Sequence, residues 1–298
     1  MSGGVDSSVT AALLLEEGYD VIGVTMQILQ KDQEAEQSGG CCSLSAVNDA
    51  RRVADRLGIP YYVMNFRDLF AEKVIDYFTA EYLQGRTPNP CIACNRYIKF
   101  EAFFEKALAL EADYIATGHY VINTFDQERN RHVLYRAVDK AKDQSYVLYT
   151  MTQEQLARTL FPLGRYTKPE IRKKAAALGL LVADKPDSQE ICFVPDNNYR
   201  RFLQERVAAN EIKPGNFLNT KGEVIGQHQG LPFYTVGQRK GLGLALGYPA
   251  YVVALDPRRN AVIIGRDDEV FQRGLLAADN NFIAIPALTE PMEVKAKI

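Results

Sequence analysis

The sequence has no apolar run long enough to cross a membrane and no excess of charge of either sign. Its longer apolar runs, residues 21–26 and 175–183, fall well short of the roughly 20 residues that span a bilayer. Met1 is followed at once by Ser-Gly-Gly rather than by a basic and then apolar leader. The 35 basic and 37 acidic residues give a net charge of −2, which offers no electrostatic argument for a nucleic-acid partner. We therefore expect a cytoplasmic protein with no membrane partner, and any role on RNA must be argued from motifs.

Cysteine and histidine are also scarce. Five cysteines, an odd number in 298 residues, do not form the pattern of a secreted disulfide framework. A reducing compartment leaves such cysteines available for metal or redox chemistry. The three histidines, His119, His132 and His228, are scattered along the chain, which argues against a Cys/His zinc site.

The alternation of helical and strand patterns from residue 9 to about residue 120 indicates an α/β fold with a doubly wound parallel sheet. Beyond about residue 207, glycines separate short strand-like pieces, which predicts a small β-rich domain. The predicted domains are a catalytic domain at 1–206, the β-rich domain at 207–265 and a third segment at 266–298. The expected helices are 9–17, 46–57, 71–83, 95–110 and 169–178, and the expected strands are 21–26, 61–65, 114–117, 251–255 and 261–264.

Residues 2–8 read SGGVDSS and predict a loop that binds nucleotide phosphates. Gly3 and Gly4 have no Cβ, so the backbone there can take positive φ and bring its N–H groups up against phosphate oxygens. A helix beginning near Val9 would direct the positive end of its dipole at the same point. Asp6 is expected to hold Mg²⁺, since a carboxylate beside phosphates would otherwise repel them. The predicted phosphate site comprises Ser2, Gly3, Gly4, Val5, Asp6, Ser7 and Ser8.

The alternative interpretation of this segment is a glycine-rich turn before an N-capped helix. The segment lacks the lysine of G-x-x-x-x-G-K-[ST] and does not match G-x-G-x-x-G, so the ordinary kinase and dinucleotide-binding interpretations fail.

A C-x-x-C pair, Cys91 and Cys94, lies in the segment TPNPCIACNR at residues 87–96. Two prolines stiffen the loop and deliver the pair to the expected start of a helix. In a first helical turn, with Arg96 and Lys99 close in sequence, the thiolate of Cys94 should be stabilised, which makes it a candidate nucleophile. Half of a zinc site is the competing interpretation, although no second C-x-x-C exists.

Two other cysteine positions are less informative alone. Cys192 lies in DSQEICFVP at 187–195, a polar stretch expected to lead into a short strand, and a cysteine in such a setting is more often a buried small apolar side chain than a catalyst. The neighbouring pair Cys41 and Cys42 is interpreted as structural or incidental, because adjacent cysteines rarely close a strain-free disulfide.

Five motifs follow one another along the chain in this order: SGGVDSS at 2–8, PNPCIACN at 88–95, TGHY at 117–120, KDQSY at 142–146 and SQEICF at 188–193. The first resembles the PP-loop of the ATP pyrophosphatase superfamily, whose members transfer AMP from ATP to an oxygen. Together, and over nearly the whole chain, the five resemble the tRNA-specific 2-thiouridylase family. The resemblance implies ATP-dependent thiolation of wobble uridine 34 in tRNAs for Lys, Glu and Gln.

The resemblance also implies a mechanism. The C2 oxygen of uridine is a poor leaving group, and adenylation lets it depart as AMP when the sulfur of a Cys192 persulfide attacks. Cys94, which matches the family's catalytic cysteine, would take up the inner sulfur and leave a Cys94–Cys192 disulfide that a reductant reopens. A persulfide donor or sulfur-relay protein is then an implied partner, and the uridine must be unstacked to react.

Further residues are carried over by their place in these motifs. Met26 and Gly118 would line the adenine and ribose of ATP. The implied contacts to tRNA are Asn89, Pro90, Cys91, Lys142, Asp143 and Gln144.

The sequence departs from the family pattern in two respects. Many members have Asp where this chain has Cys91, so a further hypothesis is that Cys91, Cys94 and Cys192 hold three irons of a [4Fe–4S] cluster whose fourth iron carries sulfide. Members also have a strand before the phosphate loop and a longer C-terminal β-barrel, so we expect both ends to be truncated, with an alternating strand at 294–298.

Two other functions remain open at this point. One is a different PP-loop ligase or amidotransferase that adenylates a small carboxylate or carbonyl and needs no cysteine. The other is a non-catalytic, zinc- and nucleotide-binding RNA module.

Overall fold

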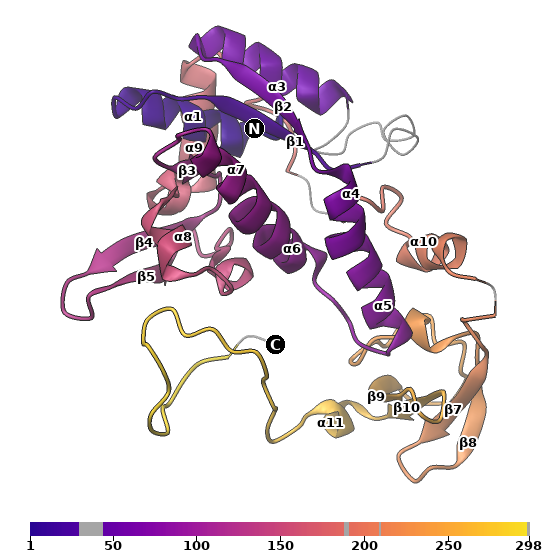
Figure 1. The fold of residues 1–298 in the computed structure, drawn as a ribbon. Helices are drawn as coiled ribbons and strands as arrows, with labels where there is room; N and C mark the ends of the chain where they lie inside the picture. Colours follow the sequence, from indigo (N-terminus) through magenta and orange to yellow (C-terminus); the bar gives the residue numbers. More distant parts are fainter. Residues whose placement is uncertain (30–43, 188–190, 209, 297–298) are drawn as a thin grey trace. The chain divides into compact units, whose positions relative to one another are not determined.

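The computed structural model describes residues 1–29, 44–187, 191–208 and 210–296 (Figure 1). The chain forms two compact units. Unit 1 comprises Met1–Ala71, Cys91–Phe193 and Asp279–Ile298, and unit 2 comprises Glu72–Pro90 and Val194–Ala278. In the described part of the chain, no helix combines the length and the apolar character needed to cross a membrane.

Unit 1 begins with the elements that carry the phosphate loop. Helix α1 (Val5–Glu16) is followed by strand β1 (Gly23–Gln27), helix α3 (Leu44–Leu57) and strand β2 (Tyr61–Asn65). β1 and β2 pair in parallel, with Gly23 opposite Tyr61. A parallel pair needs a crossover connection, and α3 buries its apolar stripe as that crossover. These elements confirm the predicted βαβ arrangement.

A second group of elements begins at the C-x-x-C segment. α6 (Pro90–Ala93), a π-helical segment (Cys94–Phe103) and α7 (Phe104–Ala109) form one continuous run. β3 (Ile115–Ala116) pairs in parallel with β6 (Thr159–Leu160). The sequence predicted one doubly wound sheet, whereas the described strands form two separate parallel pairs, β1 with β2 and β3 with β6.

Between β3 and β6 lies a hairpin that the sequence analysis did not predict. β4 (Val121–Asp126) and β5 (Arg131–Arg136) pair antiparallel around a turn in which Asn130 has φ of +50°. A 3₁₀ turn (Ser145–Leu148) and the short helix α8 (Gln153–Ala157) lead into β6.

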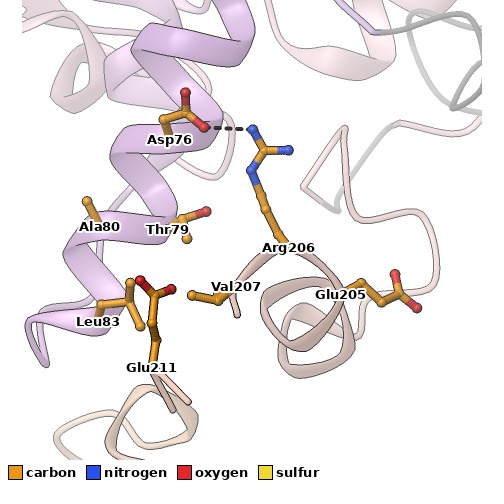
Figure 2. Close-up of a pocket in the computed structure, with 8 residues that line it drawn as sticks. All are labelled: Asp76, Thr79, Ala80, Leu83, Glu205, Arg206, Val207 and Glu211. Carbon is orange, nitrogen blue, oxygen red and sulfur yellow. Dashed lines mark hydrogen bonds and ion pairs between the residues drawn. The ribbon is translucent and has the colours of Figure 1, made fainter. Parts of the chain in front are cut away.

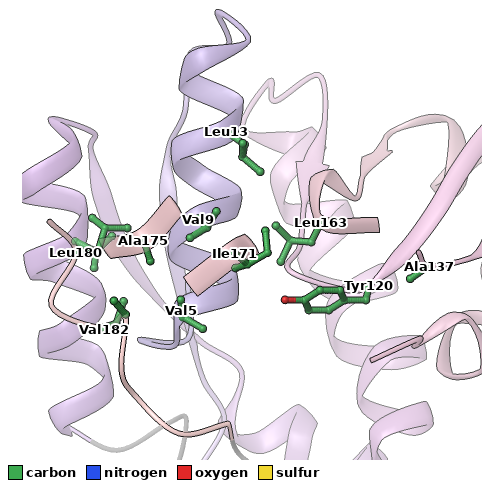
Figure 3. Close-up of a cluster of buried hydrophobic side chains, with 12 residues drawn as sticks. Val5, Val9, Leu13, Tyr120, Ala137, Leu163, Ile171, Ala175, Leu180 and Val182 are labelled. Carbon is green, nitrogen blue, oxygen red and sulfur yellow. The ribbon is translucent and has the colours of Figure 1, made fainter. Parts of the chain in front are cut away.

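The core of unit 1 joins the phosphate-loop helix to α9 (Lys168–Ala177), which agrees with the predicted helix at 169–178 to within one residue. Val5, Val9 and Leu13 of α1 pack in one cluster with Ile171 and Ala175 of α9 (Figure 3). α9 starts with a Thr167–Glu170 capping box, in which the Glu170 carboxylate accepts from the Thr167 backbone N–H and from its hydroxyl, each at 2.7 Å. The first turns of α1 and α9 are thereby fixed relative to each other.

Unit 2 holds the predicted β-rich domain. Its four-stranded sheet has the order β8-β7-β10-β9. The strands are β7 (Gly215–Asn219), β8 (Val224–His228), β9 (Tyr251–Asp256) and β10 (Ala261–Gly265). β9 and β10 form the predicted hairpin, and β10 also pairs in parallel with β7. One face of the sheet is filled by an apolar cluster that includes Phe217, Phe233, Val252 and Val262.

The helices of unit 2 precede and follow that sheet. A π-helical segment (Ala71–Asp76) and α5 (Tyr77–Leu83) continue from α4 (Arg67–Phe70), so the predicted helix at 71–83 begins four residues early. α10 (Tyr199–Arg206) comes before β7, and α11 (Asp267–Val270) follows β10. The strand expected at 294–298 is absent from its described residues, 294–296.

Candidate functional site

The phosphate loop is built from one strained glycine and a helix N-terminus. Gly3 has φ of +66°, whereas Gly4 is extended with φ of −101° and is the N-cap residue of α1, so only Gly3 uses the left-handed conformation that is open to both glycines. A Cβ on Gly3 would lie 2.3 Å from the carbonyl oxygen of Ala46. The helix starts at Val5 rather than near Val9, which places Asp6 in its first turn. Backbone N–H groups and the helix dipole therefore converge on this loop, as anion binding requires.

The three serine hydroxyls of the loop differ in availability. Ser8 is fully buried, and its hydroxyl donates to the Gly4 carbonyl at 2.8 Å. Ser7 Oγ accepts from the Ser2 N–H at 3.1 Å and lies 3.3 Å from Ser2 Oγ. Ser8 therefore stabilises the loop from within, while Ser2 and Ser7 lie at its surface.

The segment 117–120 lies directly against the loop. A Cβ on Gly118 would be 3.0 Å from the Asp6 backbone carbon and from the Ser7 nitrogen. The Tyr120 hydroxyl donates to Asp6 Oδ1 at 2.8 Å, and burial together with the Asp6 charge raises the pKa of Tyr120, so that it stays a donor. Met26, the other predicted nucleotide contact, lies half-buried on β1.

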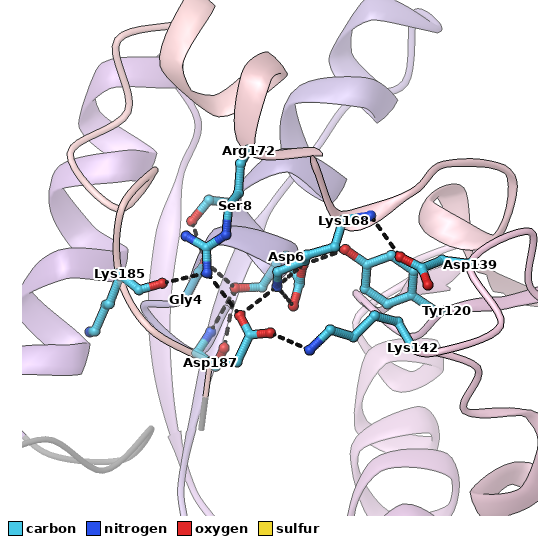
Figure 4. A network of polar contacts seen from close by, with 12 residues as sticks. Gly4, Asp6, Ser8, Tyr120, Asp139, Lys142, Lys168, Arg172, Lys185 and Asp187 are labelled. Carbon is cyan, nitrogen blue, oxygen red and sulfur yellow. Dashed lines mark hydrogen bonds and ion pairs between the residues drawn. The ribbon is translucent and has the colours of Figure 1, made fainter. Parts of the chain in front are cut away.

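A cluster of charges, which we call the lysine–aspartate network, lies beside the loop and consists of Asp6, Lys142, Lys168, Arg172 and Asp187 (Figure 4). Lys168 Nζ is 2.8 Å from both carboxylate oxygens of Asp6 and 2.7 Å from Asp187 Oδ1. Asp187 also accepts from Lys142 Nζ at 2.7 Å and from Arg172 at 3.2 Å. Partial burial acts to raise the pKa of Asp187, but the hydrogen bonds and charges of Lys142 and Lys168 outweigh it and lower that pKa.

The network extends into the segment that leads to Cys192. Arg172 donates to the carbonyl oxygens of Ala183 and Lys185 at 2.6 and 3.0 Å. Lys185 Nζ in turn donates to the Gly3 carbonyl at 3.0 Å and lies 2.9 Å from Asp49 Oδ2. Lys185 therefore connects the segment at residues 183–187 to the phosphate loop.

The sequence analysis missed Lys168, Arg172, Lys185 and Asp187. Lys168 stands in a Thr-Lys-Pro-Glu helix start, where a solvated cation is the ordinary expectation. Only the fold brings it to Asp6, 162 residues away.

The structure changes the setting predicted for Cys94. The helical run begins at Pro90, with proline in the first turn, and not at residue 95. Cys91 therefore occupies the first turn and is exposed, while Cys94 is half-buried at the start of the π-helical segment. Because a helix dipole acts mainly within its first turn, it favours a thiolate at Cys91 more than at Cys94.

Cys192 also belongs to unit 1 and is half-buried. It lies in a turn, not in a lead-in to the strand expected there, and the next residue, Phe193, packs edge-on against Phe70. Cys41, Cys42 and residues 188–190 lie outside the described residues. Within the residues that are described, no three His, Cys, Asp or Glu side chains are grouped to hold a metal ion.

The predicted tRNA contacts belong to two segments of the chain, residues 89–91 and residues 142–144. In the first segment, Asn89 and Pro90 belong to unit 2 and Cys91 belongs to unit 1. Lys142 is part of the network, Asp143 accepts from the Ala137 N–H at 3.0 Å, and Gln144 accepts from the Tyr120 N–H at 3.1 Å. The KDQ motif thus stabilises the segments that border the phosphate loop.

Unit 2 carries an open groove of about 550 Å³ between α5 and α10 (Figure 2). Arg206 closes an ion pair with Asp76 at 2.6 Å across it. No residue predicted from the sequence to bind or react lines this groove.

Comparison with known proteins defines the class first. A family model described as "tRNA methyl transferase HUP domain" matches residues 1–196, and one described as "tRNA methyl transferase PRC-barrel domain" matches residues 200–266. The chain is thus a HUP-domain protein with a second, β-rich domain, which confirms the predicted α/β fold and the PP-loop class that uses ATP.

Curated relatives narrow this class. The tRNA-specific 2-thiouridylase MnmA of Heliobacterium modesticaldum is 65% identical over 298 residues, covering all of this chain and 77% of the relative. The enzymes of the same name from Carboxydothermus hydrogenoformans and Pelotomaculum thermopropionicum are each 62% identical over 300 residues, covering all of this chain and 82% of each relative. The chain belongs to the tRNA-specific 2-thiouridylase family.

Proposed function

We propose that this chain is an ATP-dependent tRNA sulfurtransferase that replaces the C2 oxygen of uridine 34 with sulfur. The observation that carries the proposal is the presence, in one compact unit of a chain from this family, of a phosphate loop and two half-buried cysteines, Cys94 and Cys192. ATP supplies the leaving group and the cysteines supply the sulfur.

The phosphate loop fits the ATP phosphates. Gly3 provides the left-handed turn, Ser2 and Ser7 lie at the surface, and the start of α1 directs N–H groups at an anion. Asp6 would hold Mg²⁺ together with phosphate oxygens, and a third of its side chain is exposed for that purpose. Met26 and Gly118 would contact the adenine and ribose.

Sulfur transfer then follows from thiol chemistry. The terminal sulfur of a Cys192 persulfide attacks C2 of the adenylated uridine, and the C2–O bond breaks with AMP as leaving group. The Cys94 thiolate attacks the inner Cys192 sulfur, which breaks the S–S bond and leaves 2-thiouridine and a Cys94–Cys192 disulfide. A reductant and a fresh persulfide from a donor or relay protein restore the enzyme.

The [4Fe–4S] hypothesis has less support. None of the described residues, Cys91, Cys94 and Cys192 included, form a three-ligand metal group. One solved structure, the U34-tRNA thiolase NcsA from Methanococcus maripaludis with its [4Fe-4S] cluster, is 17% identical with a TM-score of 0.40 over 71% of this chain and 66% of that chain, too little to support an argument.

We propose that the substrates are tRNAs of the Lys, Glu and Gln types and that the reaction takes place in the cytoplasm. Residues 89–91 and 142–144 would contact the tRNA. The three domains would be residues 1–206, 207–265 and 266–298.

The test is to incubate the protein with ATP, Mg²⁺, a persulfide donor and tRNA, and to measure 2-thiouridine and pyrophosphate together. Cys192→Ser should still release pyrophosphate with tRNA present but form no 2-thiouridine, because adenylation precedes sulfur transfer. Cys94→Ser should likewise form none. Thiolation that survives either substitution refutes the assigned roles, and pyrophosphate release that needs a small metabolite instead of tRNA would favour another PP-loop ligase.

A further inference from the structure

A single buried ammonium group connects the two carboxylates beside the phosphate loop. Only 9% of the Lys168 side chain is exposed. An ammonium group has three N–H donors, and Lys168 Nζ has three carboxylate oxygens within 2.8 Å, two on Asp6 and one on Asp187 (Figure 4). Every donor of Lys168 is therefore used, and two of the three acceptors belong to the residue expected to bind Mg²⁺.

Burying a lysine costs desolvation free energy even when the lysine is paired, so the buried position of Lys168 needs an explanation. Asp6 does not need it, since the first turn of α1 favours a negative charge and Tyr120 already donates to the carboxylate. The start of α9 does not need it either, because Thr167 and Glu170 already cap that end of the helix. Lys168 instead suits a task that arises only when a ligand enters the loop.

The charges of the lysine–aspartate network indicate when an anion would be favoured. Three cations, Lys142, Lys168 and Arg172, face the carboxylates of Asp6 and Asp187, and a third carboxylate, Asp139, accepts from the Lys168 backbone N–H at 3.0 Å. These charges balance while Asp6 contacts Lys168, so a positive charge that favours an anion is left over once the Asp6 carboxylate turns to a metal ion. Lys142 and Arg172 both contact Asp187, which fixes Asp187 whatever happens at Asp6.

Resting on the proposed function, we propose that Lys168 is an ATP-binding residue that changes partners when Mg·ATP binds. Asp6 turns from the ammonium group to Mg²⁺, and the N–H donors of Lys168 that Asp6 releases go to a phosphate oxygen. Asp187 keeps hold of Lys168 throughout and acts as a positioning residue. Without nucleotide, the Lys168 ammonium group occupies the position beside the Asp6 carboxylate that Mg²⁺ would take.

This exchange predicts effects of opposite sign for one substitution. Lys168→Met should weaken Mg·ATP binding about 10- to 100-fold, the scale of a lost charge-assisted hydrogen bond. Binding of Mn²⁺ alone should become several-fold tighter, because the cation that competes for Asp6 is gone. Adenosine affinity should not change. A lysine with a merely structural role would not separate these three measurements.

The experiment uses calorimetry for Mg·ATP and adenosine and electron paramagnetic resonance for Mn²⁺ on the full chain. Lys173→Met, on the exposed side of α9, is the matched control and should bind all three like the wild type. If Lys168→Met does not fold, Lys168→Gln, which keeps a neutral donor, is measured in the same way.

Equal losses of ATP and adenosine affinity, or Mn²⁺ affinity that stays level, would overturn the exchange while leaving the proposed function intact. A wild-type chain that fails to bind Mg·ATP would overturn both.

Discussion

The two glycines of the phosphate loop should differ strongly in how much stability the same substitution costs. Gly3 has φ of +66°, and its added Cβ would lie 2.3 Å from the Ala46 carbonyl oxygen, a backbone atom that cannot rotate away. Gly4 has φ of −101°, and the nearest atom to its added Cβ is Ser2 Oγ at 3.5 Å. Gly3→Ala and Gly4→Ala therefore form a matched pair.

The magnitudes follow from these geometries. A left-handed conformation costs an alanine about 1–2 kcal/mol, and forcing an extra methyl group into packed structure costs about 1–3 kcal/mol. Gly3→Ala should thus lower the free energy of unfolding by about 2–5 kcal/mol, a large part of the roughly 5–15 kcal/mol typical of a folded protein. For Gly4→Ala, the gain in backbone rigidity and the poorer N-cap nearly cancel, leaving a change within about 1 kcal/mol.

Urea unfolding measures both changes. The sequence has no tryptophan, so far-ultraviolet circular dichroism is the suitable signal. A Gly3→Ala protein as stable as the wild type, or two variants destabilised equally, would refute the geometry described for the loop.

Three further predictions concern other parts of the chain. The ring of His228 accepts from Gly230 N–H and donates to the Asn260 carbonyl, and burial lowers the pKa of His228. Below pH 6.5 the unfolded chain takes up a proton that the folded chain resists, so stability should fall by up to about 1.4 kcal/mol per pH unit; His228→Gln should flatten that slope in urea titrations from pH 6.5 to 5.5. Arg172→Lys should lose the forked contact to two backbone carbonyls and destabilise the protein by about 1–3 kcal/mol, and an unchanged urea midpoint would contradict this. Ile171→Ala, at a fully buried site, should cost about 2–5 kcal/mol against about 0.5–1.5 for Ile171→Val, and similar losses would argue against the packing of α1 on α9.

Local patterns predicted most of the regular structure because they depend on neighbouring residues. The strand at 61–65 agrees with β2 in both bounds, and the helix at 169–178 agrees with α9 to within one residue. The β4–β5 hairpin was missed, although alternating apolar residues on either side of a Gln-Glu-Arg-Asn turn were a usable signal.

Helix starts were harder to predict. Gly4 as N-cap brings the start of α1 forward to Val5, and Pro90 as a first-turn residue brings the later helix forward past both cysteines. Each early start changes which side chain lies in the dipole field, and so changes the chemistry assigned to it.

The pairing of charges was beyond the reach of sequence patterns. Asp6 could be predicted as a ligand from its loop, but its partner Lys168 is 162 residues away and looks like an ordinary surface cation. The choice among 35 basic residues is made by the packing of α1 against α9, which no local motif encodes.

The shared acceptor at Asp187 has an evolutionary consequence. Its carboxylate accepts from Lys142 and from two residues one turn apart on α9, Lys168 and Arg172. Removal of this carboxylate would leave all three cations short of an acceptor, which is costly because Lys168 is only 9% exposed. We therefore expect Asp187 and its three cationic partners to be conserved or replaced together in related sequences.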